Sequence, residues 1–146
     1  MANPKSDQNA IDKFMEDLLN DGYTNIKKQK APADILAKKD GVQYYFEIKK
    51  TMQKKSYFGA ATLTEWESAI QNPNTYKFVI AKTTDDINFK FKKYTPAEFM
   101  AFSTIPPFKI NFNIDLKVST KVPTRRSAKQ LTEKNLELLS VVYKNI

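Results

Sequence analysis

The chain is predicted to fold as an α/β domain in which helices flank a mixed β-sheet. Three observations lead to this prediction. Apolar side chains recur at helical spacing over residues 7–21, and three strand-like segments follow between residues 23 and 50. A second helical pattern near residues 64–71 then precedes an almost continuously apolar strand at 76–82. The order helix, three strands, helix, strand indicates a mixed sheet with helices packed against it.

Length and composition favour one domain over residues 1–146, with a core at about 7–82. Hydrophobic residues make up 41% of the chain, which is enough for a sizeable core. No apolar run is long enough for a membrane span, and the first residues lack a signal-peptide core. The absence of cysteine suits an intracellular protein of the cytoplasm or nucleoid. The oligomeric state stays open, with a homodimer among the alternatives.

The first half of the chain is expected to contain a helix, a strand and a β-hairpin. Ser6 or Asp7 can cap the helix over 7–21, and a polar strand follows at about 23–29. The hairpin arms are predicted at roughly 32–38 and 42–50, because Asp40-Gly41 is a favoured two-residue turn.

The second half begins with a helix and a buried strand. Thr64 and Glu67 match a capping box, which predicts a helix that ends near Gln71. The strand at 76–82 is followed by a half-exposed strand at 88–94 and by a short helix opened by Thr95-Pro96. Residues 83–146 are expected to add further strands, including 108–116, a polar basic loop at 117–129 and a C-terminal helix at roughly 127–144.

The turn fixes a register for the hairpin. If Lys39 and Val42 flank the turn, Asp34 faces Glu47 across the strands, with Cβ atoms about 5 Å apart. Lys49, two residues beyond Glu47, projects from the same face. Like charges directly opposite each other destabilise a sheet unless something compensates, and a divalent cation would do so.

These residue types suit phosphodiester hydrolysis, which needs a metal held by carboxylates and a positioned water. Asp34 and Glu47 would hold the metal, with the carbonyl of Ile48 as a further ligand. Lys49 would orient or deprotonate the water, or stabilise the charge on phosphorus. An E-x-K tripeptide also arises by chance in a lysine-rich chain, so a surface salt-bridge ladder is the alternative. Because His and Cys are absent, zinc sites and His-based nucleophile systems are excluded.

Further acids occur on the two helices. Asp12 and Glu16 lie one turn apart at the border of the first helix's apolar stripe, where either could supply an additional acid to the site. Solvation is the alternative for both. Glu65, at the first turn of the second helix, could approach the site or simply favour the helix dipole.

The net charge of +8 indicates a polyanionic partner, for which DNA is the expected one. The positive charge is almost entirely lysine, so base composition of the genome and simple solvation offer an alternative reason for it. The residues expected to contact phosphates are Lys50, Thr51, Lys54, Lys55, Arg125 and Arg126.

The succession of motifs resembles the PD-(D/E)xK nuclease superfamily, whose fold is restriction-endonuclease-like. A helix ending in D-G-Y is followed by a strand, then A-D-I, then F-E-I-K. The run E-I-K-K-T, E-W-E-S-A and Y-K-F-V-I is similar, more narrowly, to the nuclease-like domain named after the plant NO VEIN protein.

The resemblance covers roughly residues 7–82 and implies DNA cleavage that depends on Mg²⁺ (or Mn²⁺). It implies that Asp34 and Glu47 are metal ligands, that Lys49 is the catalytic lysine, and that Asp12 is the helix acid. The chain departs from the pattern in having Ala33 directly before Asp34, with Pro32 one place early.

The sequence therefore predicts a metal-dependent endonuclease that hydrolyses DNA phosphodiester bonds. The alternative is a catalytically inactive module on the same fold that binds nucleic acid or another protein.

Overall fold

The computed structural model describes residues 4–104 and residue 116. The chain divides into two units, Met1–Ser103 and Thr104–Ile146, and every helix and strand given below belongs to the first. The elements predicted at 108–116, 117–129 and 127–144, together with Arg125 and Arg126, lie outside the described residues apart from Leu116. They stay predictions, as does the single domain over 1–146.

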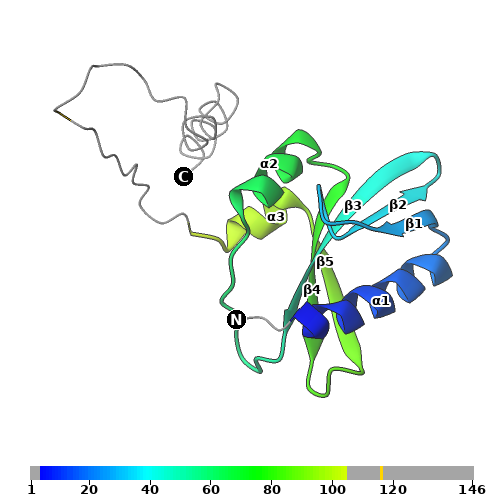
Figure 1. The fold of residues 1–146 in the computed structure, drawn as a ribbon, viewed down its shortest axis with the longest axis horizontal. Helices are drawn as coiled ribbons and strands as arrows, with labels where there is room; N and C mark the ends of the chain where they lie inside the picture. The colour runs from blue at the N-terminus through cyan, green and yellow to red at the C-terminus, as the bar shows by residue number, and fades with distance from the viewer. Residues whose placement is uncertain (1–3, 105–115, 117–146) are drawn as a thin grey trace. The chain divides into compact units, whose positions relative to one another are not determined.

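The predicted fold class is confirmed by a five-stranded mixed sheet with helices on both faces (Figure 1). The strands lie in the order β1-β2-β3-β4-β5, and only the β3–β4 pair is parallel. The elements, in chain order, are α1 (Pro4–Asn20), β1 (Thr24–Lys28), β2 (Ile35–Lys39), β3 (Val42–Thr51), α2 (Leu63–Gln71), β4 (Tyr76–Thr83), β5 (Phe89–Tyr94) and α3 (Pro96–Ala101).

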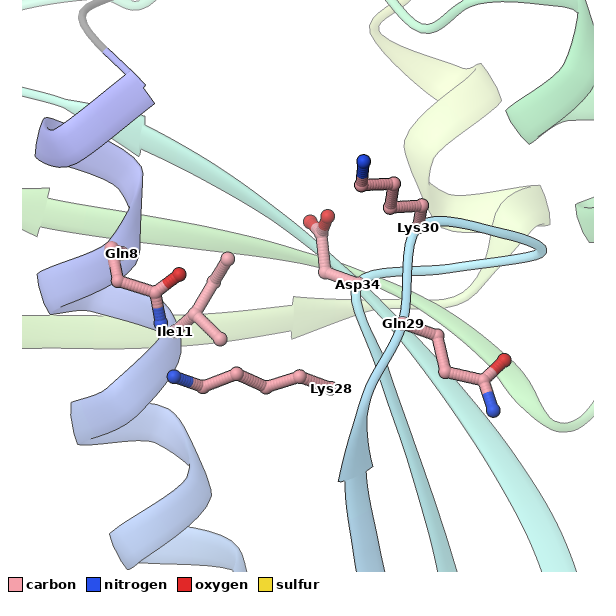
Figure 2. Close-up of a pocket in the computed structure, with 6 residues that line it drawn as sticks. All are labelled: Gln8, Ile11, Lys28, Gln29, Lys30 and Asp34. Carbon is pink, nitrogen blue, oxygen red and sulfur yellow. The ribbon is translucent and has the colours of Figure 1, made fainter.

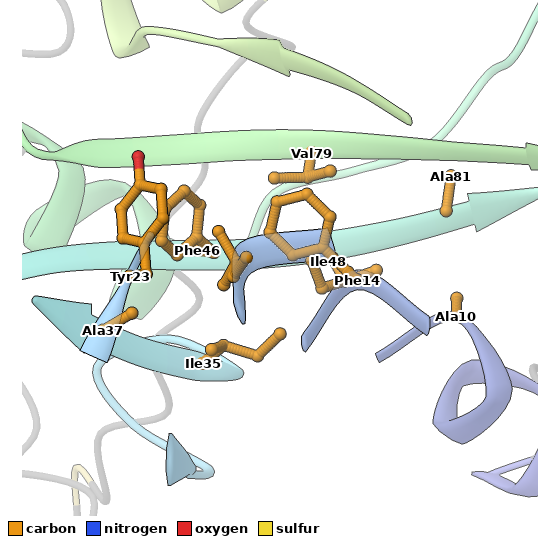
Figure 3. Packing of buried hydrophobic residues seen from close by; sticks show 10 residues of the cluster. Ala10, Phe14, Tyr23, Ile35, Ala37, Phe46, Ile48, Val79 and Ala81 are labelled. Atoms are coloured by element: carbon orange, nitrogen blue, oxygen red, sulfur yellow. The ribbon is translucent and has the colours of Figure 1, made fainter. Parts of the chain in front are cut away.

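Helix α1 covers one face of the sheet with its apolar stripe. Phe14 is central to this contact, because its ring centroid lies 5.3 Å from that of Phe46 and 5.0 Å from that of Phe91. Ile35, Ile48 and other buried side chains complete the core under α1 (Figure 3). Since side chains alternate along a strand, Phe46 and Ile48 on this face place Glu47 and Lys49 on the other.

The opposite face is covered by α2 and α3. Phe78 of β4 lies between them, with its ring centroid 5.6 Å from Trp66 of α2 and 4.3 Å from Phe99 of α3. Tyr76 and Ala69 are fully buried in the same cluster. Glu47 and Lys49 therefore emerge beneath the start of α2 rather than into open solvent.

The hairpin turn and its register are as the sequence predicts. Asp40 and Gly41 have φ of +52° and +78°, which is the geometry of the turn that matches strand twist. Lys39 pairs with Val42, and the register continues without a shift to Ile35 opposite Phe46. One step further along this register sets Asp34 opposite Glu47.

Two predicted helix starts are wrong. Helix α1 begins at Pro4, so Ser6 and Asp7 lie within it; proline suits a first turn because its missing N–H would have no partner there. Helix α2 is capped by Thr62 with Glu65, not by Thr64 with Glu67. The two boxes overlap in the sequence, and the earlier one also lets the Glu65 carboxylate reach Lys49. None of the described helices is long and apolar enough to cross a membrane.

Candidate functional site

Asp34 is held at the end of the hairpin by its neighbours on both sides. Its carboxylate Oδ2 accepts a hydrogen bond from the backbone N–H of Ile48 at 2.8 Å. Its backbone carbonyl accepts one from the N–H of Gln29, also at 2.8 Å. Asp34 also lies close enough to Glu47 for its negative charge to raise the pKa of the Glu47 carboxyl group. The two predicted acids are therefore neighbours in the structure.

Lys49 completes the predicted trio, and Glu65 holds it in place. The Lys49 ammonium lies 3.1 Å from Oε2 of Glu65, and these side chains are 10% and 19% exposed. It also donates to the carbonyl of Ala60 at 2.9 Å. Glu65 Oε2 accepts the N–H of Thr62 at 3.0 Å as part of the helix cap, so the α2 N-terminus fixes the position of the carboxylate.

Glu65 is a site residue that the sequence analysis considered but left undecided. It is paired with Lys49, and its negative charge helps to raise the pKa of Glu47. The signal that could have found it is the Thr62-x-x-Glu65 capping box, because that box orients Glu65 toward the strand that precedes the helix.

The cluster gathers several acids in a partly buried place. Three carboxyl groups, on Asp34, Glu47 and Glu65, lie near the single ammonium of Lys49. Burial raises the pKa of Glu47 to about 8, and the charges of Asp34 and Glu65 add to the shift while Lys49 opposes it. Burial also raises the pKa of Asp34, although the Ile48 N–H and Lys49 oppose this. A cation bound between them would reverse both shifts.

Tyr76 closes the buried side of the cluster. Its hydroxyl donates to the carbonyl of Pro32 at 3.2 Å. Burial, followed by the negative charges of Glu47, Glu65 and Asp34, raises the pKa of this phenol far above its ordinary value. Tyr76 therefore remains neutral and separates the acids from the core formed by Phe78 and α2.

An open pocket of about 310 Å³ reaches Asp34 from the solvent side (Figure 2). Gln8 and Ile11 of α1 form one wall. Lys28, Gln29 and Lys30 at the end of β1 form the rest, so two lysines stand beside the approach to the acid. An anionic ligand entering here would come near Lys30 and near Lys28, which is paired with Asp12.

Asp12 and Glu16 are not brought into the acid cluster. Asp12 is paired with Lys28 and accepts from Gln8, and the bond from Lys28 lowers the pKa of Asp12. Glu16 pairs with Lys13 at 3.1 Å. Both acids line a separate pocket of about 810 Å³ between α1 and β1. A role for either as an additional acid stays a prediction, with no contact to Asp34 or Glu47 to support it.

The residues expected to bind phosphates divide into two groups. The Lys50 ammonium lies 2.8 Å from Asp86 with its side chain 8% exposed, and Thr51 is buried. Lys54 and Lys55 are exposed. Among the four of these residues that the structure describes, Lys54 and Lys55 are thus exposed to a ligand, whereas Lys50 is paired with Asp86 and Thr51 is buried.

Asp34 and Glu47 supply two carboxylates, which suits a magnesium site in which the protein provides only some of the ligands. Across residues 4–104, no group of three or more His, Cys, Asp or Glu side chains is arranged to hold a metal ion. Mg²⁺ is usually bound by one or two carboxylates, with waters and substrate phosphates supplying the other ligands. The Asp34–Glu47 pair matches that smaller requirement.

Comparison with known protein families identifies a match. A family model described as "Protein NO VEIN, C-terminal" matches residues 6–92, which is more than half of the chain and includes every residue of the acid cluster. Comparison with curated proteins found no match, and comparison with solved structures found none either. The chain belongs to the NO VEIN C-terminal family.

Proposed function

We propose that this protein is a metal-dependent endonuclease that hydrolyses DNA phosphodiester bonds. The observation that carries the proposal is the half-buried position of Asp34 beside Glu47, with Lys49 next to them on the same sheet face. The resemblance of A-D-I and F-E-I-K to PD-(D/E)xK nucleases supports the same reading.

Asp34 and Glu47 are the residues that would hold Mg²⁺ or Mn²⁺, and the Ile48 carbonyl is the further ligand proposed. The ion would lower the pKa of a water and stabilise the negative charge that develops on the phosphate. The raised pKa of Glu47 supports this assignment: Asp34 and Glu65 lie near enough to oppose its ionisation, and a divalent cation bound by Asp34 and Glu47 would favour the charged form.

Lys49 is suited to stabilise charge rather than to remove a proton. An ammonium has three N–H donors. Within the described residues, Glu65 and the Ala60 carbonyl take two of them, and the third can donate to the attacking water or to a phosphate oxygen. Glu65 is a positioning residue, because it acts on the reaction by holding Lys49.

In the proposed reaction a water oxygen attacks phosphorus and the bond to the leaving sugar oxygen breaks. The products are a terminal phosphate and a free hydroxyl, so atoms balance without any co-reactant. Lys28 and Lys30 at the pocket, together with Lys54 and Lys55, are the basic residues proposed to hold the DNA backbone.

The test is cleavage of plasmid DNA with Mg²⁺ or Mn²⁺. Wild type is expected to nick or linearise the plasmid, and both Asp34→Asn and Lys49→Met should abolish this. Asp17→Asn, which removes an exposed acid on α1, is the matched control and should cleave like wild type. Wild type that stays inert while binding DNA with a steep salt dependence would contradict the enzyme and support the inactive binding module.

A further inference from the structure

Two exposed aromatic side chains lie in the connector between β3 and α2, which spans residues 52–62. Phe58 is 90% exposed and Tyr57 is 39% exposed, although large aromatic side chains normally contribute most when buried. The Tyr57 ring folds back over Gly59, where an added Cβ would lie 2.8 Å from the tyrosine hydroxyl oxygen. The absence of a side chain at Gly59 therefore leaves room for the Tyr57 ring, next in sequence to the exposed Phe58.

The connector is tied to the fold on both sides of this aromatic pair. At its start the carbonyl of Lys54 accepts from the Lys82 ammonium at 3.4 Å. At its end the carbonyl of Ala60 accepts from Lys49 at 2.9 Å. Because consecutive Cα atoms are about 3.8 Å apart, Phe58 lies within about 8 Å of the residue that binds the Lys49 ammonium. The backbone that carries the aromatic pair therefore lies within two residues of the contact that holds Lys49.

Lysines and a hydroxyl adjoin the two rings in the run K-K-S-Y-F-G. This combination matches a ligand that carries both negative charge and flat apolar faces. Nucleobases of an unpaired strand present such faces next to phosphates, whereas bases inside a duplex are already stacked on their neighbours. An acidic protein segment would satisfy the lysines, but it offers flat rings only where it contains aromatic residues, whereas every nucleotide carries a ring next to a phosphate.

We propose that Tyr57, Phe58, Lys54 and Lys55 form a binding site for unpaired nucleobases of a DNA strand. The rings stack on one or two bases, and the lysines contact the phosphates that flank them. This arrangement sets the adjoining phosphodiester next to Lys49, so the substrate class is DNA with a single-stranded segment. The inference rests on the proposed function for its catalytic consequence, but binding of the bases stands on the connector alone.

The test measures binding without cleavage. Fluorescence anisotropy is recorded in EDTA with a labelled single strand of about 20 nucleotides, which exceeds a typical single-strand site, and with a duplex of the same length. Wild type should bind the single strand more tightly. Phe58→Ala and Phe58→Leu should weaken single-strand binding about 5- to 150-fold, as expected for loss of one stacked base, and Phe58→Trp should restore it.

Two controls isolate the stacking contact. Leu19→Ala removes an exposed apolar side chain of α1 and should leave both affinities unchanged. A strand whose bases are replaced by abasic sites should bind wild type weakly and should be insensitive to Phe58→Ala. Lys54→Ala with Lys55→Ala should instead weaken both strands alike and reduce the salt dependence of binding.

The proposal is overturned if Phe58→Ala binds the single strand as tightly as wild type does, if the abasic strand binds equally well, or if the duplex is preferred. Binding of a protein partner through Phe58 with no affinity for DNA would also overturn it. If wild type shows Phe58-dependent binding but never cleaves, the stacking site stands and the proposed nuclease function fails.

Discussion

Replacing Glu47 with glutamine should change the stability of the protein in a way that depends on pH. The folded protein raises the pKa of Glu47 from 4.5 to about 8. Below pH 4.5 the carboxyl group is protonated in both folded and unfolded chains, so burial of a charge costs nothing. Between these two values the unfolded chain releases the proton while the folded chain keeps it, and wild type loses stability as pH rises.

The size of the effect follows from the shift. A change from 4.5 to about 8, at about 1.36 kcal/mol per pH unit, gives a ceiling of about 5 kcal/mol. Glu47 is partly exposed and its ionisation is coupled to that of Asp34, and both reduce the change in the free energy of unfolding. A difference of about 2–4 kcal/mol is therefore expected. Glu47→Gln carries no titratable proton and avoids the loss. It should match wild type near pH 4.5 and exceed it by that amount above pH 8.

Urea unfolding in EDTA measures this difference. Trp66 is the single tryptophan and lies 5.6 Å from Phe78 between ring centroids, so its fluorescence reports on packing next to the site. Free energies of unfolding are compared at several pH values, with equal urea slopes as the check on two-state behaviour. Leu19→Ala, which changes an exposed side chain without a titratable group, should give a difference that does not change with pH. A Glu47→Gln difference that is flat with pH, or largest in acid, would refute the assigned pKa shift.

Two further predictions concern the residues that position Lys49. Thr62→Ala should lower the free energy of unfolding by about 0.5–2 kcal/mol, because it removes the cap of α2. Thr64→Ala is the control and should have little effect. Equal losses for the two variants in urea unfolding would contradict the assigned cap. Glu65→Gln should lower kcat for DNA cleavage more than it changes DNA affinity, because it removes the ion pair that holds Lys49 but no contact with the DNA. A loss of DNA affinity alone would contradict the positioning role.

The hairpin shows how far sequence reasoning reaches. Asp40-Gly41 permits the positive φ that the turn needs, and the alternation of side chains then sets Asp34 opposite Glu47 without any tertiary information. Local chemistry determined this register, so it was predictable. The strand at 76–82 and the helix opened by Thr95 were predictable for the same reason, since each has a strong local signal.

The start of α2 and the position of Asp12 depend on tertiary contacts, which local sequence does not determine. Two overlapping capping boxes begin at Thr62 and at Thr64, and the sequence gives no reason to choose between them. The contact of Glu65 with Lys49 accompanies the first, and that contact exists only once α2 lies over the sheet. Asp12 is a second case. Its position on the helix predicts that it can reach the site, but Lys28 of β1 pairs with it in a separate pocket.

Calorimetric titration with Mn²⁺ tests most directly whether the acid cluster is a metal-dependent site. The titration is run at pH 7 in two buffers of different ionisation heat, so that the number of released protons is counted. Wild type should bind one ion and release a proton, because the pKa of Glu47 is about 8 without metal and must fall when a cation binds. Asp34→Asn and Glu47→Gln should both weaken binding strongly. No binding by wild type, or binding that neither variant affects, would contradict a metal centre at Asp34 and Glu47.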